Sequence, residues 1–468
     1  MKKKPYQTTA IQKFSLTDAI VVAIAPGCIV ALDIAKHKMV GVIADVLGRT
    51  LVAFRFSHPT ETPHFLALVG RLRSGCRGPF KVGMEPTGVY GDALRAQLLL
   101  HEVPVVMVSP KHTHDMQEVF DGVPSGHDPK SAMIIADLVA RGKCSSYVPS
   151  PEGRLRMRAL VDERRFVTAQ SDKAFGLLEA MTMRHWPESQ HWMHIRTSRS
   201  FQHLLRDVGG PQQIAAEPEA AKKVLRVRSR GQFTQIVIDE TIASAQKTVG
   251  VPMVAEEVTL LQRVASTILD HGTSLDDLDV RLHGLMGICP AAHALESLTG
   301  TYTAAVLTTM LDPLAYANPR QMEKAAGLNL RHHSSGELKG QLHITKRGPS
   351  LVRHVLYMLA LRLIRDDALV RAWYMKRKSY TPHEPDAYDE QGARGHKRSA
   401  IVAVVRKIVR ALWHVARGKE FDATKLFDAS RLTTEAKAPR VAFPARSAPR
   451  RARRSGPSHK IKEVPTPL

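Results

Sequence analysis

The sequence predicts an α/β domain built on a mixed sheet at the N-terminus, followed by a helical coiled-coil region and a mainly α-helical C-terminal domain. Short apolar runs alternate with turn residues over positions 29–56, as they do in β-strands. Further apolar runs continue to about position 110, with helical stretches between them. From about 151 the spacing of apolar residues becomes helical. The chain has 468 residues, more than one hydrophobic core usually spans, so we expect two or three domains.

Changes in composition along the chain suggest where the domains begin and end. The expected parts are an N-terminal extension at 1–26, the α/β domain at 27–150, the helical and coiled-coil region at 151–290, the C-terminal domain at 291–425 and a tail at 426–468. The tail is rich in Lys, Arg and Pro. This composition is typical of disorder and adds nonspecific affinity for nucleic acid.

The elements of the α/β domain are predicted in chain order. The runs IVALDIA, MVGVIADV and TLVAFRF are three short strands, joined by links that are short enough for hairpins. A helix is expected at 61–74, a strand at 80–85, a helix at 91–103 and a strand at 104–110. The order βββ-α-β-α-β is typical of a mixed sheet rather than of a regular doubly wound one.

The region 254–285 carries apolar residues at intervals of three, four and seven. This spacing predicts a coiled-coil seam, with a break at Gly272. An ordinary amphipathic helix pair explains the same spacing equally well.

The charge balance indicates a polyanionic partner. Lys and Arg number 67 against 44 Asp and Glu, which gives a formal charge of +23. Nucleic acid is the first expectation and an anionic membrane surface the second, but no basic amphipathic helix dominates the sequence. The four cysteines are far apart and form no metal-ligand or disulfide pattern, which fits a reducing cytoplasm. The apolar stretch after the N-terminal lysines is interrupted by Pro26, so neither a signal peptide nor a membrane span is expected.

Two carboxylates stand where strands end. Asp33 lies between Leu32 and Ile34, and Glu85 ends the strand FKVGME. Because sites gather at strand ends of α/β sheets, we expect the two to share a hard cation such as Mg²⁺. A hydrogen-bonded buried carboxylate is the alternative for Asp33. Asp128 precedes Pro129 at the start of a predicted helix, where helix capping explains it as well as metal binding does.

Several motifs in the same order resemble one family. The segments VALDIAKHK, GMEPTGVYGDAL, VSPKHTHDM and HDPKSAMIIADLV are similar to the RuvC-like, RNase H-type domain of the DEDD-type insertion-sequence transposases. The segments SLTGTYTAAVL, NPRQMEKAAGLNLRHHSSG, HITKRGPSLVRHVLYMLA and HKRSAIVAVVRKIVRALWHV resemble the C-terminal transposase domain of that family. The resemblance covers roughly 29–425 and implies a DNA recombinase that moves its own insertion sequence.

The resemblance also implies an acidic site. Asp33, Glu85 and Asp128 take the first three acidic positions and would hold Mg²⁺. The fourth acid is expected three residues after Asp128, on the same helix face, but Ser131 stands there. A hydroxyl can orient a metal-bound water but supplies no charge. Asp137 is turned away from that face and is a poor substitute.

A serine nucleophile is implied in the C-terminal domain. The motif's matching residues are Gly327, Leu328, Ser335 and Gly336, with Ser334 as a weaker candidate for the nucleophile. Leu330 replaces the usual proline of the motif. Without the resemblance, a polar Ser-Ser-Gly turn is the simpler interpretation.

Basic residues around this motif are expected to bind nucleic acid. Arg331, Lys346, Arg347 and Arg353 would contact backbone phosphates, and a merely solvated loop is the alternative. Residues 298–305 resemble a helix-hairpin-helix backbone binder.

The family resemblance implies donor and target DNA as partners, together with a noncoding bridge RNA that selects them by base pairing. It also implies a homo-oligomer, a dimer or tetramer, joined through the coiled coil, in which the two domains of one active site come from different protomers. Two alternatives remain: a catalytically inactive RNA- and DNA-binding relative, because of Ser131, and a metal-dependent junction nuclease that does not use Ser335.

Overall fold

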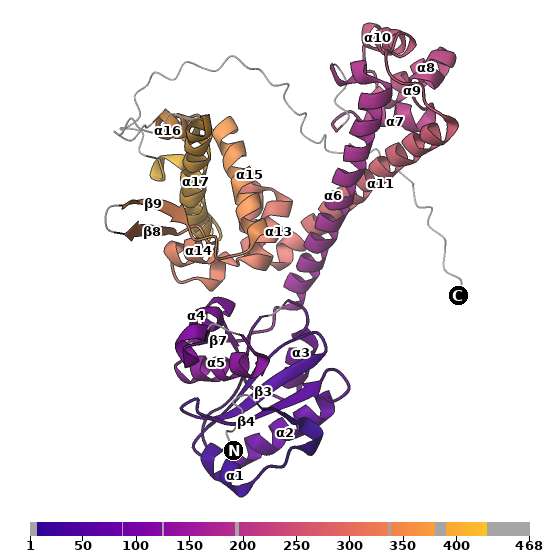
Figure 1. Cartoon of the computed structure of the whole chain (residues 1–468). Coiled ribbons are helices and arrows are strands. Elements are labelled where there is room, and N and C mark those ends of the chain that lie inside the picture. Colours follow the sequence, from indigo (N-terminus) through magenta and orange to yellow (C-terminus); the bar gives the residue numbers. More distant parts are fainter. Residues whose placement is uncertain are drawn as a thin grey trace, which may run out of the picture. The chain divides into compact units, whose positions relative to one another are not determined.

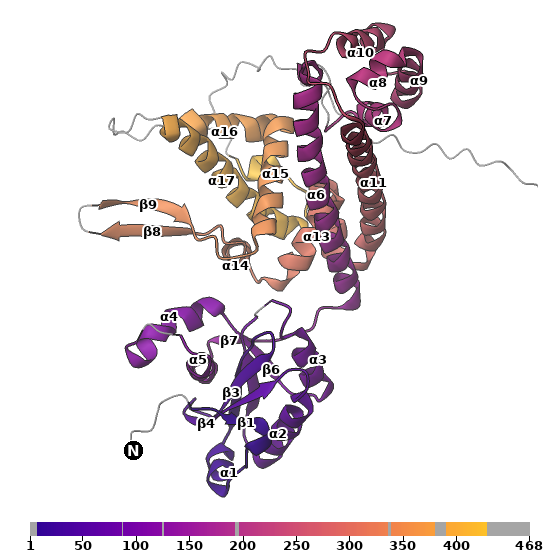
Figure 2. The ribbon, with the colours of Figure 1, turned by 45° about the vertical axis from the view of Figure 1, so that its right-hand side comes forward.

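The computed structural model describes residues 7–86, 88–123, 126–191, 196–335, 338–379 and 390–427. The chain divides into two units, Met1–Ser150 and Pro151–Leu468 (Figures 1 and 2). No helix in the described ranges is both long and apolar enough to cross a membrane. Most of the expected basic tail, residues 428–468, lies outside the described residues.

The first unit is a seven-stranded mixed sheet in the order β1-β4-β3-β2-β5-β6-β7. Its strands are β1 (Thr9–Ala10), β2 (Cys28–Asp33), β3 (Lys38–Asp45), β4 (Thr50–Ser57), β5 (Phe80–Met84), β6 (Val105–Val108) and β7 (Cys144–Ser146). Strand β2 pairs antiparallel with β3 and parallel with β5. The predicted mixed sheet is therefore confirmed, and β1 and β7 are additions that the sequence pattern did not predict.

Helices cover both faces of this sheet. They are α1 (Asp18–Ile24), α2 (Thr62–Gly75), α3 (Asp92–Leu100), α4 (Pro110–Asp121) and α5 (Asp128–Ala140), with a 3-10 turn η1 (Ile11–Lys13) before them. Val30 and Leu32 of β2 are buried in the core that α2 and α3 complete, whereas Ile29 and Ala31 are buried under α5. Because side chains alternate along a strand, Asp33 shares the face of Ala31.

The segment expected as an N-terminal extension contributes to the same core. Strand β1 pairs parallel with β4, and Ile11 and Ile24 are buried among the residues of the α2 and α3 face. Residues 9–24 are thus part of the sheet domain.

The second unit is organised around two long helices, α6 (Glu152–His185) and α11 (Ala255–Leu285). They run antiparallel, because Arg164 pairs with Asp279 at 2.6 Å while Arg184, near the end of α6, lies 3.4 Å from Glu257 at the start of α11. Figures 1 and 2 show the two helices side by side. The seam predicted for 254–285 is therefore filled within the chain by an antiparallel helix pair.

The predicted break at Gly272 is wrong. Helix α11 passes through Gly272 without interruption. A glycine inside a helix costs about 1 kcal/mol relative to alanine, which the packing of Ile268 and Leu278 into the helical cores offsets.

Each end of the long helix pair carries its own core. At one end, Trp186 and Phe201 are buried among α7 (Arg199–Asp207), α8 (Pro211–Ala216), α9 (Pro218–Ser229) and α10 (Gln235–Gln246), after the turn η2 (Pro187–His191). At the other end lie η3 (Met286–Ile288), α12 (Pro290–Thr299), α13 (Thr301–Met310), η4 (Pro313–Ala315), α14 (Pro319–Ala325), α15 (Ser350–Asp366), α16 (Ala368–Ser379), α17 (Glu390–Val415) and η5 (Ala423–Lys425).

A two-stranded hairpin interrupts the C-terminal helices. Strands β8 (Leu330–Ser335) and β9 (Leu338–Ile344) pair antiparallel and form a separate sheet (Figure 2). The backbone holds the base of the hairpin: Lys346 N–H donates to the carbonyl of Gly327, and Thr345 N–H to that of Asn329, both at 2.9 Å. Gly327 has φ 72°, and an added Cβ there would lie 2.6 Å from the nitrogen of Arg347. The glycine before the hairpin is thus required by close backbone approach.

Gly83 of β5 lets helix α5 pack closely on the sheet. A Cβ at Gly83 would lie 2.7 Å from the Cγ2 of Val139 on α5. We predict that Gly83→Ala destabilises the protein by about 1–3 kcal/mol, because overpacking displaces α5. Thermal unfolding of the full chain measures the effect. Gly70→Ala is the control, because nothing lies within 4 Å of a Cβ at this α2 position. An equal loss of stability in both variants would contradict the close packing of α5 on β5.

Candidate functional site

Parallel pairing brings Asp33 and Glu85 together at the carboxyl ends of the neighbouring strands β2 and β5. Leu32 of β2 pairs with Met84 of β5, and Asp33 and Glu85 are the next residue of each strand segment. Both side chains are half-buried. Because paired residues of parallel strands point to the same face, both carboxylates lie on the side that α5 covers. Asp33 ends β2 as predicted, and Glu85 follows the last residue of β5.

Asp128 joins them from helix α5. It is the first residue of the helix, exposed, and the N-cap position belongs to His127. Among the described residues, no hydrogen bond or ion pair of the Asp128 carboxylate is found, so the capping interpretation has no capping bond to support it. Its charge is close enough to act on Asp33.

The electrostatics of Asp33 reflect this convergence. Burial raises its pKa, and the neighbouring carboxylates of Asp128 and Glu85 raise it further, to about 7, against a smaller lowering by the backbone N–H of Ile34. Within the described ranges no Lys, Arg or His pairs with any of these three acids. In the part of the chain that the structure describes, three carboxylates thus lie together without a Lys or Arg paired to them.

Asp45 shows what a structural carboxylate at a strand end looks like in this sheet. Its Oδ1 accepts from the N–H groups of Leu47 and Arg49, both at 3.0 Å, and its Oδ2 accepts from Arg49 Nε at 2.6 Å. Burial raises the pKa of Asp45, but these donors outweigh it and the pKa is lowered. Asp33 has the opposite shift because burial raises its pKa, the acids beside it raise the pKa further, and a single backbone donor opposes them.

The acidic group fits a hydrated cation better than a closed metal cage. Among the described residues, no three His, Cys, Asp or Glu side chains are near enough to hold an ion without help. Mg²⁺ keeps several waters and is usually held by one or two carboxylates together with substrate phosphates. The uncompensated charge on Asp33, Glu85 and Asp128 fits that mode of binding.

Ser131 lies on α5, one turn after Asp128, and is half-buried. Its backbone N–H donates to the carbonyl of His127 at 2.9 Å, as the first turn of the helix requires. Asp137 is engaged elsewhere, because its Oδ1 accepts from Arg141 Nε at 2.9 Å. No acid in this helix therefore takes the place that Ser131 leaves.

Lys130 supports the site and was not predicted. It is fully buried in α5, and its Nζ donates to Asp121 Oδ1 and to the carbonyl of Val123, both at 2.6 Å. These bonds tie the start of α5 to the end of α4, on both sides of the segment that leads to Asp128. The only signal in the sequence was a lysine within the apolar run of a helix.

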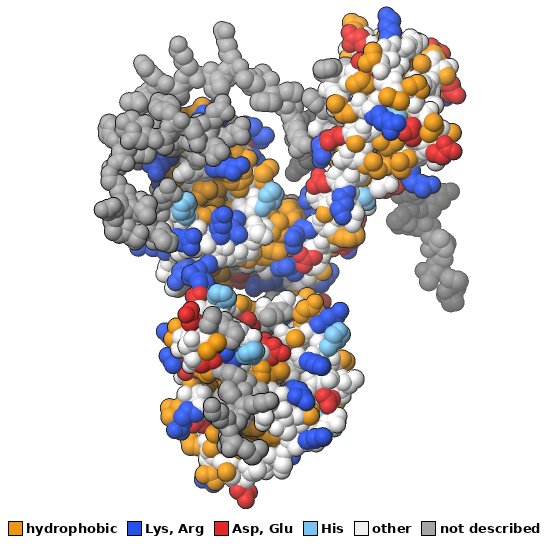
Figure 3. Space-filling model, in the orientation of Figure 1, with side chains coloured by type: hydrophobic (Ala, Val, Ile, Leu, Met, Phe, Trp, Pro, Cys, Tyr) orange, Lys and Arg blue, Asp and Glu red, His pale blue; other side chains and the backbone are white. Residues whose placement is uncertain are grey.

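The predicted serine and the basic residues belong to the second unit. Ser335 is the last residue of β8 and pairs with Leu338, while Gly336 lies outside the described residues. Arg331, Lys346 and Arg347 are exposed at the base of the hairpin, and Arg353 lies in the first turns of α15. Lys and Arg side chains predominate over acidic ones on the visible face around α13–α17 (Figure 3).

The segment compared with a helix-hairpin-helix forms the junction of α12 and α13. Gly300 stands between the two helices with φ 82°. Arg362 of α15 donates to the carbonyl of Leu298 and so holds this junction against the next helix.

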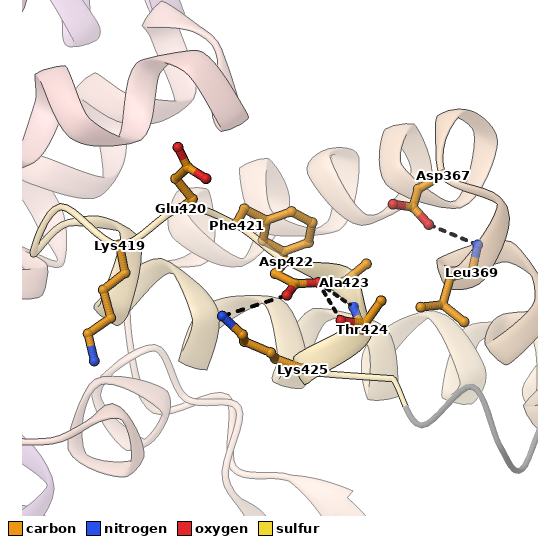
Figure 4. Close-up of a pocket in the computed structure, with 9 residues that line it drawn as sticks. All are labelled: Asp367, Leu369, Lys419, Glu420, Phe421, Asp422, Ala423, Thr424 and Lys425. Carbon is orange, nitrogen blue, oxygen red and sulfur yellow. Dashed lines mark hydrogen bonds and ion pairs between the residues drawn. The ribbon is translucent and has the colours of Figure 1, made fainter.

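A wide hollow of about 750 Å³ lies between the start of α16 and the segment 419–425 (Figure 4). Two of the three carboxylates that line it, those of Asp367 and Asp422, have structural partners. Asp367 accepts from the N–H of Leu369 at 2.9 Å, and Asp422 accepts from Thr424 N–H at 2.9 Å and lies 3.6 Å from Lys425. These contacts cap short helical turns, so the hollow is not a candidate for the acidic site.

The raised pKa of Asp33 predicts a pH-dependent stability. Since the folded pKa lies above the unfolded value of 3.8, ionisation costs stability as the pH rises from about 4 through about 7. In metal-free buffer, Asp33→Asn is expected to raise the melting temperature at pH 8 by about 3 °C or more, since 1 kcal/mol corresponds to about 2–4 °C at this size. At pH 3, below the unfolded pKa, the gain is expected to shrink to near zero.

Asp45→Asn is the matched control for this experiment. It removes a carboxylate with satisfied hydrogen bonds, so it is expected to lower the melting temperature at pH 8. Calorimetry or circular dichroism of the full chain gives both values. A lower melting temperature for Asp33→Asn at pH 8 would show that Asp33 is held by favourable bonds instead.

Comparison with known families identifies two separate regions. Residues 30–183, from β2 into α6, match a family model described as a transposase, of the DEDD type of IS110. Residues 292–375, from α12 to α16, match the model of the transposase IS116/IS110/IS902 family. A search of the curated proteins finds no match. With IS110-family transposase domains in two places along the chain, the protein is a DNA transposase, an enzyme that recombines DNA.

Proposed function

We propose that this transposase moves its insertion sequence by Mg²⁺-assisted attack of Ser335 on DNA phosphodiesters, guided by a noncoding bridge RNA. The observation that carries the proposal is the convergence of Asp33, Glu85 and Asp128, with no Lys or Arg of the described ranges paired to them. The two family matches supply the reaction class.

In this proposal, one or two of the carboxylates of Asp33, Glu85 and Asp128 would contact Mg²⁺ directly, and bound water would link the ion to the rest. The ion, when bound, stabilises negative charge on a phosphate oxygen. The protein's own part is to keep these carboxylates together, which the β2–β5 pairing, Gly83 and Lys130 do.

Ser335 is the proposed nucleophile. Its Oγ forms a bond to phosphorus, the bond from phosphorus to one deoxyribose oxygen breaks, and that oxygen leaves as a hydroxyl with the proton lost by the serine. The resulting phosphoserine ester keeps a reactive phosphodiester, and a second DNA hydroxyl reverses the step during rejoining. Ser335 ends β8, on the same hairpin whose base carries the exposed Arg331, Lys346 and Arg347, which supports a role on a phosphate-binding element.

The partners follow the same proposal. Exposed basic residues at the hairpin base and the half-buried Arg353 in the first turns of α15 fit contacts to phosphates of donor and target DNA and of the RNA. The homo-oligomer, a dimer or tetramer, would form through the outer faces of α6 and α11. Leu155, Phe166 and Leu177 of α6 are large apolar side chains that remain exposed in one chain and support such a contact.

Ser131 favours a second candidate function. Without a fourth carboxylate, the protein would bind RNA and DNA but exchange no strands. No other acid in α5 can replace the missing carboxylate, because Asp137 is already paired with Arg141. This observation supports the inactive, nucleic-acid-binding alternative.

A recombination assay separates these functions. Full-length protein, Mg²⁺, donor and target DNA and the noncoding RNA that flanks the gene are combined, and joined products are counted by sequencing. We expect exchange by the wild type, loss of at least a thousandfold in Ser335→Ala because the nucleophile is missing, and equal or faster exchange in Ser131→Asp.

The controls decide between the alternatives. Ser334→Ala removes the neighbouring hydroxyl and is expected to keep activity. Cleavage that survives in Ser335→Ala would indicate a metal-dependent nuclease. A silent wild type that Ser131→Asp restores would indicate an inactive relative.

The basic residues predict a salt dependence. Lys346→Ala and Arg347→Ala are each expected to weaken binding to any DNA sequence and to reduce the slope of log affinity against log salt by about 1. Fluorescence anisotropy with duplexes of two unrelated sequences measures this. Lys223→Ala, an exposed lysine of α9, is the control and is expected to keep the wild-type slope. Slopes that stay unchanged in the hairpin variants would place phosphate binding elsewhere.

A further inference from the structure

A small cavity lies at the base of the β8–β9 hairpin, against α15 and α17. Its volume is about 270 Å³. Leu328, Ile344 and Val405 provide apolar walls, and Leu328 and Val405 are buried. Ligand pockets for drug-sized molecules start at about 300 Å³, so this cavity suits a single ring system.

The remaining wall is aromatic and cationic. Tyr357 is half-buried and lines the cavity, together with Arg353 and the exposed His354, all from α15. Arg353 Nη1 donates to the carbonyl of Gly348 at 2.6 Å, which fixes the guanidinium beside the start of α15. Across the described part of the chain neither Arg353 nor His354 pairs with an acid. An apolar hollow with an aromatic side and the guanidinium of Arg353 in its wall fits a flat ring attached to an anion.

We propose that this cavity holds one unstacked nucleobase of the nucleic acid substrate, stacked on Tyr357, with Arg353 near its phosphate. The inference rests on the proposed function only in assuming that nucleic acid lies along the β8–β9 hairpin. A base within a duplex cannot enter a pocket, so the occupant is a base from a single strand or one turned out of the helix.

The position of the cavity suggests a role distinct from the chemistry. Ser335 lies five residues along β8 from Leu330, which pairs with Ile344 at the cavity. At about 3.3 Å per residue, the serine is about 17 Å from the hairpin base. A base held there fixes the register of the strand relative to the serine without contacting the reacting atoms. Tyr357 is thus a positioning residue.

The test compares two single-stranded probes of equal charge with the full-length protein. One is a 12-nucleotide oligo-dT and the other is a 12-mer with abasic sites at every position. Stacking on an aromatic side chain is worth about 5- to 150-fold per base. We expect the wild type to bind the base-bearing probe more tightly by at least fivefold, and Tyr357→Ala to lose most of this preference. The abasic probe is expected to bind both proteins equally.

Three further variants make the result specific. Tyr357→Phe keeps the ring and is expected to keep the preference. Val402→Trp fills the cavity from α17 and is expected to abolish the preference, which covers the case in which Tyr357→Ala unfolds. Met358→Ala, at the next and exposed residue of α15, is expected to behave as wild type.

Other outcomes overturn the inference. A preference that survives in both Tyr357→Ala and Val402→Trp, or no preference in the wild type, would show that no base occupies the cavity. The readout is independent of Ser335. If the wild type shows no base preference but recombines DNA in a Ser335-dependent reaction, only this site is refuted. If it shows the preference but cleaves DNA without Ser335, only the proposed chemistry is refuted.

Discussion

The convergence of three carboxylates at the carboxyl ends of β2 and β5 is the constraint on which the first unit depends. Asp33 and Glu85 meet because their strands are parallel and in register, and Asp128 meets them because α5 lies close on the sheet. Each of these supports has a physical cost. Position 83 must be glycine, because α5 leaves no room for a side chain there. The ammonium group of Lys130 is buried, which costs solvation energy. Asp33 lies where burial and two neighbouring acids disfavour its ionised form. A fold without a use for this charge would gain stability by losing it.

The second unit uses a different device to present its residues. Backbone packs directly on backbone where the hairpin leaves the helices, because Gly327 and Gly348 leave no room for a Cβ beside Arg347 and Ala325. The hairpin base is thereby fixed to α14 and α15. Glu323 of α14 is buried and accepts from Arg406 and Arg410 of α17 at 2.7 and 2.5 Å, which joins the same region to the last long helix. These contacts hold the base of the hairpin rigidly against α14, α15 and α17.

The sequence predicted the central strands well because their signal is local. The runs that became β2, β3, β4, β5 and β6 are apolar and end at turn residues, so the mixed sheet could be deduced without a structure. Strand β1 has two residues and β7 has three, too few for a pattern. The hairpin segment LRHHSS lacks the alternation of apolar and polar residues that predicts a strand. Gly272 predicted a helix break, but tertiary packing keeps α11 continuous at this residue. Two features could not be predicted from local sequence patterns because they depend on tertiary contacts. One is the buried hydrogen bond of Lys130 to Asp121 at the end of α4, and the other is that Asp128 makes no capping hydrogen bond.

Direct measurement of divalent-cation binding tests the central claim that these acids form a cation site. Mn²⁺ serves as the probe, and electron paramagnetic resonance of the free ion is followed while it is titrated into the full-length protein at pH 8. We expect saturable binding by the wild type, at least tenfold weaker binding by Asp33→Asn, and unchanged binding by Asp45→Asn, whose carboxylate is satisfied by Arg49. Ser131→Asp is expected to bind more tightly. Binding that is equal in the wild type and Asp33→Asn, or that is absent in the wild type, would contradict the account.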